Sequence, residues 1–265
     1  ALLAALVLAL GVNTLRQGSR QVDIPPLAPI ALDENAAGES LAVAIRARTV
    51  SSYDQPELNA DQFRALHAHL ERRYPKLHAA LERETVAGLS LLYTWRGSDA
   101  SAKPIMLMAH QDVVPIAAGT ERDWQAEPFA GAVTDGFVWG RGSWDDKANL
   151  IAQMEAIEML VATGFKPKRT VYLAFGADEE VGGLRGAKAM AALLAERKIQ
   201  LDFVIDEGLL ITDGVLPGLK APGAVIAGGS PLDDAVAFGQ WQAACCSRVS
   251  RGARRRIELG VTVGW

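Results

Sequence analysis

Short apolar runs alternate with longer amphipathic stretches through the middle of this chain, and this alternation constrains the fold more than any other feature. The runs KPIMLMAH at 103–110, RTVYLAF at 169–175 and DFVID at 202–206 have the length of strands. Between them, residues 149–164 and 186–198 repeat apolar side chains at helical spacing. Strands that are apolar throughout and separated by helices are typical of a parallel sheet with both faces covered. The sequence therefore predicts an α/β fold, with a mainly parallel sheet and helices on both faces.

Earlier parts of the chain fit the same fold class. LSLLYTW at 89–95 is short and apolar, which suits a buried strand. Residues 60–75 have the pattern of a helix with one apolar face and a proline that should stop it, through Phe63, Leu66, Leu70 and Pro75. A long loop is expected over 111–146. A length of 265 residues leaves room for one large domain, or for one domain and part of another.

Composition and charge exclude several classes of function. Hydrophobic residues make up 49% of the chain and charged residues 22%, as in soluble globular proteins. The formal net charge of −4 gives no general attraction to nucleic acid. The two cysteines, Cys245 and Cys246, are adjacent and far from any other thiol, so they build neither a disulfide framework nor a thiolate metal site.

The first twelve residues, ALLAALVLALGV, are apolar throughout. They are fewer than the roughly 20 residues that a helix needs to span a bilayer. We expect Ala1–Val12 to be the apolar core of a signal peptide or of a truncated anchor, which predicts an extracytoplasmic or membrane-anchored protein. A buried helix is the alternative. A proline-rich linker follows, so residues 1–26 are expected to precede the folded body.

Polar residues with metal-binding chemistry follow each of the three predicted strands of the α/β unit. They are His110 and Asp112 after the first, Glu179 and Glu180 after the second, and Asp206 after the third. The carboxyl ends of parallel strands meet at one edge of a sheet, where ligand sites gather. We therefore expect these side chains to lie together.

The pair His110 and Asp112 should lie on one side of the chain, because alternate side chains of an extended strand point the same way. A histidine that binds a metal through one nitrogen usually donates its other N–H to a carboxylate. A surface hydrogen bond is the alternative for such a pair. Asp145 and Asp146 stand just before a predicted helix, where one can complement the helix dipole and the other can bridge two cations.

Three adjacent carboxylates, Asp178, Glu179 and Glu180, follow the apolar run at 169–175. Like charges this close repel each other and raise each other's pKa. Bound cations would remove the repulsion and let neighbouring glutamates take different roles, with Glu180 as a metal ligand and Glu179 as a base facing the attacking water. A solvated acidic loop is the alternative, and it fits a position directly after a buried strand less well.

Four segments in this order resemble the di-zinc metallopeptidases that include aminoacylase, acetylornithine deacetylase and carboxypeptidase S. They are MLMAHQDVVP, GFVWGRGSWDDK, FGADEEVGG and FVIDEG. The resemblance is greatest to the carboxypeptidase S and N-acyl-amino-acid hydrolase branch, and it implies a partial metallopeptidase catalytic domain over 27–226. It also implies zinc-dependent hydrolysis of a peptide or N-acyl-amino-acid amide bond, with a metal-activated water and a glutamate base. The expected partner is a small peptide or N-acyl amino acid and not a nucleic acid.

The resemblance gives each site residue a role. The metal ligands of the family fall on His110, Asp145, Glu180 and Asp206, and its catalytic carboxylates on Asp112 and Glu179. His110 and Asp206 would bind one zinc, Glu180 the second, and Asp145 both. Asp112 would orient His110, and Glu179 would be the general base. Nitrogen and oxygen donors suit zinc and would also accept cobalt or manganese.

The resemblance ends after Ile226. The family continues into a lid domain that also mediates dimerisation, and then supplies a further histidine ligand. Residues 227–265 lack a lid-like strand pattern, and no histidine follows His110. We therefore expect an atypical, disordered tail, no lid or homodimer surface, and one complete three-ligand zinc site. The basic run at 248–256 is interpreted as solvated, with nucleic acid or anionic lipid binding as the alternative. The functional alternative is an inactive truncated fragment that binds at most one metal.

Overall fold

The computed structural model describes residues 2–16, 31–207, 211–212 and 223–224. Contacts within the chain divide it into two units, residues 1–32 and 33–265. Most of the predicted linker and the whole predicted tail at 227–265 lie outside the described residues. The domain boundaries expected near residues 26 and 226 therefore stay predictions.

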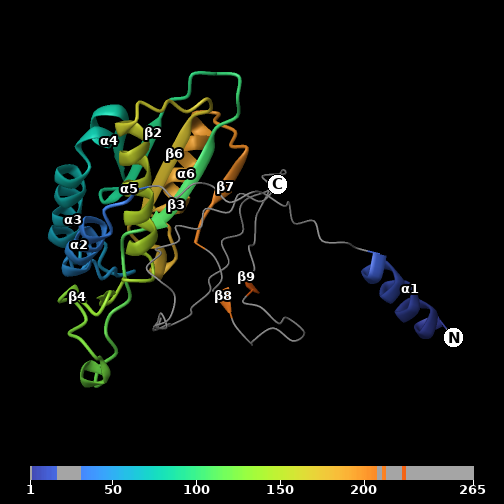
Figure 1. Ribbon diagram of the computed structural model, residues 1–265, viewed down its shortest axis with the longest axis horizontal. Coiled ribbons are helices and arrows are strands. Elements are labelled where there is room, and N and C mark those ends of the chain that lie inside the picture. The colour runs from blue at the N-terminus through green and yellow to red at the C-terminus, as the bar shows by residue number, and fades with distance from the viewer. Residues whose placement is uncertain (1, 17–30, 208–210, 213–222, 225–265) are drawn as a thin grey trace. The chain divides into compact units, whose positions relative to one another are not determined.

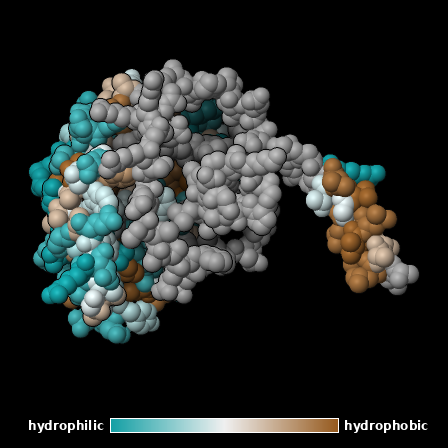
Figure 2. Space-filling view, turned by 60° about the horizontal axis from the view of Figure 1, so that its bottom comes forward, coloured by the Kyte–Doolittle hydropathy of each residue, from teal (hydrophilic) through white to brown (hydrophobic). Residues whose placement is uncertain are grey.

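The first unit contains one described helix, α1 (Leu2–Arg16). Its large apolar side chains are exposed, including Leu3 at 75% and Leu15 at 88%, and Figure 2 shows a largely hydrophobic surface along it. None of the described helices is both long and apolar enough to cross a membrane. The first apolar stretch is thus helical, and its role as a signal or anchor stays a prediction.

The second unit is built on a five-stranded sheet with the strand order β1-β2-β6-β3-β7 (Figure 1). The strands are β1 (Glu82–Val86), β2 (Ser90–Trp95), β3 (Ile105–His110), β6 (Val171–Gly176) and β7 (Phe203–Ile205). β3 is parallel to both β6 and β7, whereas β2 is antiparallel to both β6 and β1. β2 is therefore the single strand of this sheet that runs against the other four. The predicted α/β fold with a mainly parallel sheet is confirmed.

Helices cover both faces of the sheet (Figure 1). They are α2 (Glu34–Arg46), α3 (Ala60–Arg73), α4 (Pro75–Ala80), α5 (Lys147–Ala162) and α6 (Ala187–Glu196). One core packs α2 to α5 against alternate strand residues such as Tyr93 and Phe175. The other packs α6 against the intervening residues, such as Tyr172 and Ala174. Because successive strand side chains point to opposite faces, an uninterrupted apolar strand supplies both cores.

The helix ends follow the local sequence. α3 ends at Arg73, and Pro75 opens α4 at its first position, so the predicted stop is confirmed. α5 ends at Ala162, and Gly164 follows with φ of +77°, a left-handed conformation that favours glycine. At the start of α2, Asp33 accepts a hydrogen bond from the Ala36 N–H at 3.0 Å.

The remaining described elements are short. The predicted loop 111–146 contains a 3₁₀ turn, η1 (Glu121–Asp123), and a hairpin of β4 (Ala132–Thr134) and β5 (Phe137–Trp139). A second 3₁₀ turn, η2 (Glu179–Val181), follows β6, and β8 (Ile211–Thr212) pairs with β9 (Gly223–Ala224). β3 and β6 end level with each other, since His110 lies opposite Gly176. This shared edge of the sheet carries the site.

Candidate functional site

His110 is the last residue of β3, and its side chain is only 3% exposed. Its Nδ1 atom lies 3.0 Å from the backbone oxygen of Asp112 and 3.3 Å from the carboxylate Oδ1 of the same residue. Its Nε2 atom lies 2.8 Å from Oδ1 of Asp145. The two ring nitrogens thus face different partners, and Nε2 is the one directed at the other carboxylates. The structure brings His110 and Asp112 together, as the strand alternation predicts.

Burial lowers the pKa of His110, but hydrogen bonds with Asp112 and Asp145 and the charges of the surrounding acids outweigh it. The result is a pKa well above the ordinary value of the imidazole. The carboxylates around the ring thus stabilise its protonated form. Metal binding requires the neutral ring, so a cation has to compete with this proton.

Asp112 is fully buried and organises more of the site than the sequence predicts. Its carboxylate accepts a hydrogen bond from the Ser51 hydroxyl at 2.7 Å. It also accepts the backbone N–H groups of Glu179 and Glu180, both at 3.1 Å. One carboxylate therefore orients His110 and holds the acidic turn η2 against the end of β3.

The two aspartates before α5 divide their roles. Asp145 has a side chain 41% exposed and turns toward His110 Nε2. Asp146 is 2% exposed and accepts hydrogen bonds from the His110 N–H at 3.1 Å and from Asn149 Nδ2 at 3.4 Å. The first aspartate is thus available to a metal, while the second fixes the end of β3 to the start of α5.

The three carboxylates after β6 also differ in environment. Asp178 is 3% exposed and accepts the backbone N–H groups of Arg185 at 2.8 Å and Gly186 at 2.7 Å. Glu179 extends toward the site, with Oε2 3.8 Å from His110 Nε2. Burial raises the pKa of Glu180 to about 7, with the charge of Asp145 as the next cause, and it also raises the pKa of Glu179. Asp178 is therefore a structural residue, and Glu179 and Glu180 remain for chemistry.

Glu207 enters the site although the sequence analysis assigns it no role. One ligand atom each from His110, Asp145 and Glu207 lie within 4.8 Å of one another, an arrangement that could hold a metal ion. Burial raises the pKa of Glu207 to about 7, and the charges of the neighbouring acids add to this. In the sequence, Glu207 is indicated only by its position directly after Asp206, the acid that ends the run DFVID.

Asp206, the expected third ligand, is exposed like Glu207 and accepts the backbone N–H of Glu207 at 2.9 Å. β7 ends at Ile205, which pairs with Leu107, so this strand stops short of the level of His110. Glu207 lies one residue beyond Asp206 and has a longer side chain than Asp206. The described residues contain one such group of three, and Glu180 is not part of it. The ligand roles of Asp206 and Glu180 stay predictions.

The donor set fits a divalent metal. An imidazole nitrogen and carboxylate oxygens are ligands of zinc, and cobalt and manganese accept the same donors. The Nδ1 side of His110 is already held by Asp112, which leaves Nε2 for a metal. The cluster of acids is also the arrangement in which a cation would lower the electrostatic repulsion most.

Comparison with known proteins places this site in a family. Residues 106–261 match the model of peptidase family M20/M25/M40, a range that includes His110, Asp145 and all the acids of the site but not Ser51. The chain is 37% identical over 231 residues to the probable carboxypeptidase S-like 2 of Dictyostelium discoideum, covering 83% of this chain and 44% of that protein. It is 40% identical over 193 residues to the mouse N-fatty-acyl-amino acid synthase/hydrolase PM20D1, covering 72% of this chain and 38% of that protein.

A solved structure shows the same fold. Human carnosine dipeptidase 1 aligns with a TM-score of 0.54 at 19% identity, covering 67% of this chain and 39% of that one. The chain thus spans less than half the length of these relatives. The similarity to a carboxypeptidase S-like protein and to an acyl-amino-acid hydrolase confirms the branch indicated by the sequence motifs. This chain belongs to peptidase family M20/M25/M40.

Proposed function

We propose that this chain carries the metal-binding half of a zinc-dependent hydrolase that cleaves peptide or N-acyl-amino-acid amide bonds. The observation that carries this proposal is the group His110, Asp145 and Glu207, with the Glu179 carboxylate 3.8 Å from His110 Nε2. A site that can hold a metal beside a glutamate that can accept a proton is one arrangement that supports hydrolysis of an unreactive amide.

In this proposal His110, Asp145 and either Glu207 or Asp206 hold the first zinc, and Glu180 contributes to a second. Zinc supplies Lewis acidity toward the amide oxygen and lowers the pKa of a water. Cobalt or manganese would serve with the same donors. Asp112 fixes the tautomer and orientation of His110. These residues hold and orient the reacting groups but do not themselves accept the proton.

Glu179 is the proposed general base. Its carboxylate faces the His110 side of the site, whereas its backbone N–H is fixed on Asp112. Burial raises its pKa above the ordinary value of a glutamate, which brings it closer to neutral pH and improves it as a proton acceptor. It would take the proton of the attacking water at Oε2 and deliver it to the leaving amine.

The substrate class follows from the relatives. One is described as a probable carboxypeptidase and another as an N-fatty-acyl-amino acid synthase/hydrolase. Both names describe chemistry at an amide bond next to an amino acid. We therefore propose a small peptide or an N-acyl amino acid as the substrate.

Replacement of Glu179 by Gln tests the proposed base. The amide keeps the shape of the side chain but cannot accept a proton, so kcat should fall by about 10²- to 10⁴-fold with little change in KM. Zinc content, measured by elemental analysis, should stay as in the unmodified protein. Glu196→Gln, at the end of α6, is the matched control. Ordinary turnover by Glu179→Gln would contradict the assignment of the base.

We also propose that α1 associates with membrane and that the protein acts outside the cytoplasm or at a membrane surface. The exposed leucines of α1 support this, because apolar helix surface binds the boundary between headgroups and acyl chains. In a flotation assay with neutral phosphatidylcholine vesicles, the chain should float, and Leu6→Glu with Leu10→Glu should remain at the bottom. Equal flotation of both proteins would contradict the membrane role of α1.

A further inference from the structure

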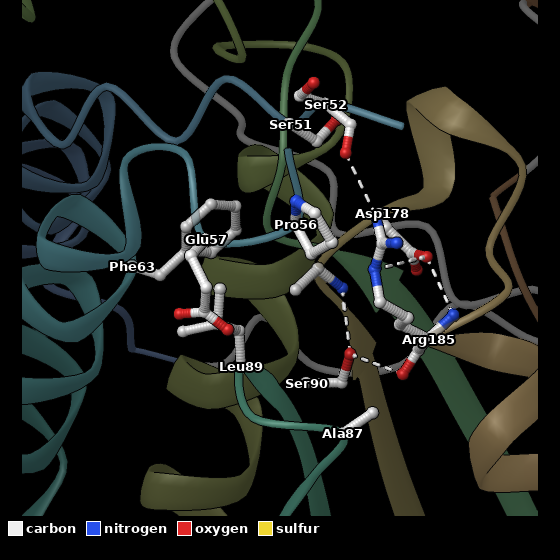
Figure 3. Close-up of a pocket in the computed structure, with 11 residues that line it drawn as sticks. Ser51, Ser52, Pro56, Glu57, Phe63, Ala87, Leu89, Ser90, Asp178 and Arg185 are labelled. Atoms are coloured by element: carbon white, nitrogen blue, oxygen red, sulfur yellow. Dashed lines mark hydrogen bonds and ion pairs between the residues drawn. The ribbon is translucent and has the colours of Figure 1, made fainter. Parts of the chain in front are cut away.

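Arg185 lies next to the acidic turn but has no part in the proposed chemistry. Its Nη2 atom donates a hydrogen bond to the backbone oxygen of Ser52 at 3.0 Å, and its Nε atom lies 3.8 Å from Oδ2 of Asp178. Figure 3 shows these contacts around a small pocket that Ser51, Ser90 and Asp178 also line. The guanidinium therefore connects two segments that are far apart in the sequence.

The Asp178 end of this connection is tightly built. The carboxylate accepts the N–H groups of Arg185 and Gly186, and the Asp178 backbone oxygen accepts the N–H of Gly183 at 2.7 Å. A Cβ atom at Gly186 would lie 2.7 Å from Oδ1 of Asp178, so only glycine fits there. The loop from Asp178 to Gly186 is thus closed on itself by one buried side chain.

Ser90 adds a second connection to this loop. Its hydroxyl donates to the backbone oxygen of Arg185 at 3.3 Å and accepts the Ala177 N–H at 3.2 Å. Both ends of the loop are therefore attached to the start of β2 (Figure 3). Attachment at both ends restricts the loop, and Glu179 and Glu180 directly follow its first attached end.

The Ser52 end of the connection leads back to the site. Ser51 donates its hydroxyl to Asp112 at 2.7 Å, and Asp112 accepts the backbone N–H groups of Glu179 and Glu180. The contacts therefore form a closed circuit: Arg185 to Ser52, Ser51 to Asp112, Asp112 to the acidic turn, and Asp178 back to Arg185. Within this circuit the Arg185 side chain is the one part that joins the segment of Ser51 and Ser52 directly to Asp178.

We propose that Arg185 is a positioning residue, which closes this circuit and thereby sets Glu179 and Glu180 relative to His110. Arg185 acts through Asp178 and the Ser51–Ser52 segment. In this proposal it binds neither the metal held by His110, Asp145 and Glu207 nor the substrate. The expected effect of Arg185 on catalysis rests on the proposed function, whereas its expected effect on the rigidity of the loop does not. The two can therefore be measured separately.

The first test measures the loop in the metal-free protein. In Arg185→Gln, the backbone N–H groups of Glu179 and Glu180 should exchange with deuterium about tenfold faster, because opening of the turn costs less free energy. Peptides from the core strand β2 should keep their exchange rates, which separates a local effect from global unfolding. Arg197→Gln is the matched control, since Arg197 is a similarly exposed arginine that is bound instead to Glu84.

The second test measures the site. Cobalt affinity, followed by visible absorption, should fall about 10- to 100-fold in Arg185→Gln, as expected when residues that support metal ligands are lost. Any hydrolytic activity should fall mainly in kcat, because the base is misplaced while the substrate contacts remain. Arg185→Lys keeps a cation near Asp178 but not the planar fork, and it should recover part of both losses.

The outcomes separate the two proposals. Unchanged exchange of Glu179 and Glu180 in Arg185→Gln would overturn the positioning role, whatever the activity. Faster exchange in a protein that binds no metal would support the positioning role and count against the proposed function. If Arg185→Gln fails to fold, the same measurements are made on Arg185→Lys. Exchange rates and cobalt affinity equal to those of the unmodified protein would overturn the positioning role. Faster exchange with weaker cobalt affinity would support it.

Discussion

At the scale of single residues, Asp112 shows how one buried carboxylate can place several groups at once. It contacts His110 and accepts hydrogen bonds from Ser51, Glu179 and Glu180. Hydrogen bonds to a charged acceptor are stronger than neutral ones, and together they offset the cost of burying the charge. The histidine and the acidic turn therefore share one anchor, and a change at Asp112 would displace both.

A second question about single residues is which of the two acids after β7, Asp206 or Glu207, binds the metal. If Glu207 is the ligand, Glu207→Gln should weaken zinc affinity by more than the roughly 10- to 100-fold typical of residues that only support a ligand. Asp206→Asn should leave the affinity nearly unchanged, because only Glu207 lies in the group with His110 and Asp145. Isothermal titration of the metal-free protein measures both variants. The opposite ranking would return the role to Asp206, as the sequence motif implies.

The sequence motifs point to most of the residues at the site, but they do not point to Glu207 and do not show which acid binds the metal. Two of these residues lie at strand ends, His110 at the end of β3 and Glu179 just after β6, and Asp145 lies just before α5. The ends of the strands are visible in the pattern of apolar residues. The choice between Asp206 and Glu207 depends on where β7 stops pairing with β3. The second function of Asp112, as acceptor for the turn after β6, depends on a contact across 67 residues that no local pattern carries.

At the scale of helices and strands, a buried polar network joins the helices on one face of the sheet. The Ser40 hydroxyl lies 3.0 Å from Nε2 of His69 and 2.8 Å from the Tyr74 hydroxyl, which donates to Glu155 at 3.1 Å. Arg73 pairs with the same glutamate at 2.7 Å. The helical pattern predicts His69 on a polar flank of α3, whereas the structure buries it in this network.

The network predicts a dependence of stability on pH. Burial lowers the pKa of His69 below the ordinary 6.5, and the charges of Arg72 and Arg73 act in the same direction. The unfolded chain then binds a proton more readily than the folded one, so the free energy of unfolding should decrease as the pH falls through about 6.5. Urea denaturation at pH 7 and pH 5 should show a smaller decrease for His69→Gln, which cannot be protonated. Equal decreases would contradict the prediction.

The larger strands and the helices α3, α5 and α6 were predictable, whereas β1, α4 and the hairpin of β4 and β5 were not. Uninterrupted apolar runs predict β2, β3, β6 and β7, because burial on both faces leaves no polar alternation. β1, ERETV, begins with three charged residues and lies at the edge of the sheet, and its pairing with β2 depends on the turn at Ala87 and Gly88. The antiparallel direction of β2 follows from that hairpin and from its place beside β6, and an apolar run says nothing about direction.

At the scale of the whole molecule, the number of zinc ions bound per chain measures how many complete metal sites this chain contains. The described residues provide one group of three ligands, so the purified chain should contain close to one zinc. Zinc at 100 times its dissociation constant should add about 2.7 kcal/mol to the free energy of unfolding, which a chelator should reverse. Elemental analysis and denaturant titration measure the two quantities. Two tightly bound zincs per chain would show that further residues complete a second site.

The order of the strands also has a consequence during synthesis on the ribosome. β2 and β3 are successive in the sequence, yet β6 lies between them in the sheet. Until residue 176 has left the ribosome, both strands present an unpaired edge of backbone groups, and the apolar face that α6 later covers is open. Such a nascent chain is open to aggregation and to capture by chaperones. The insertion of β6 joins β2 to β3 and brings the acidic turn to His110, so the two strands lose these open edges only as the site is assembled.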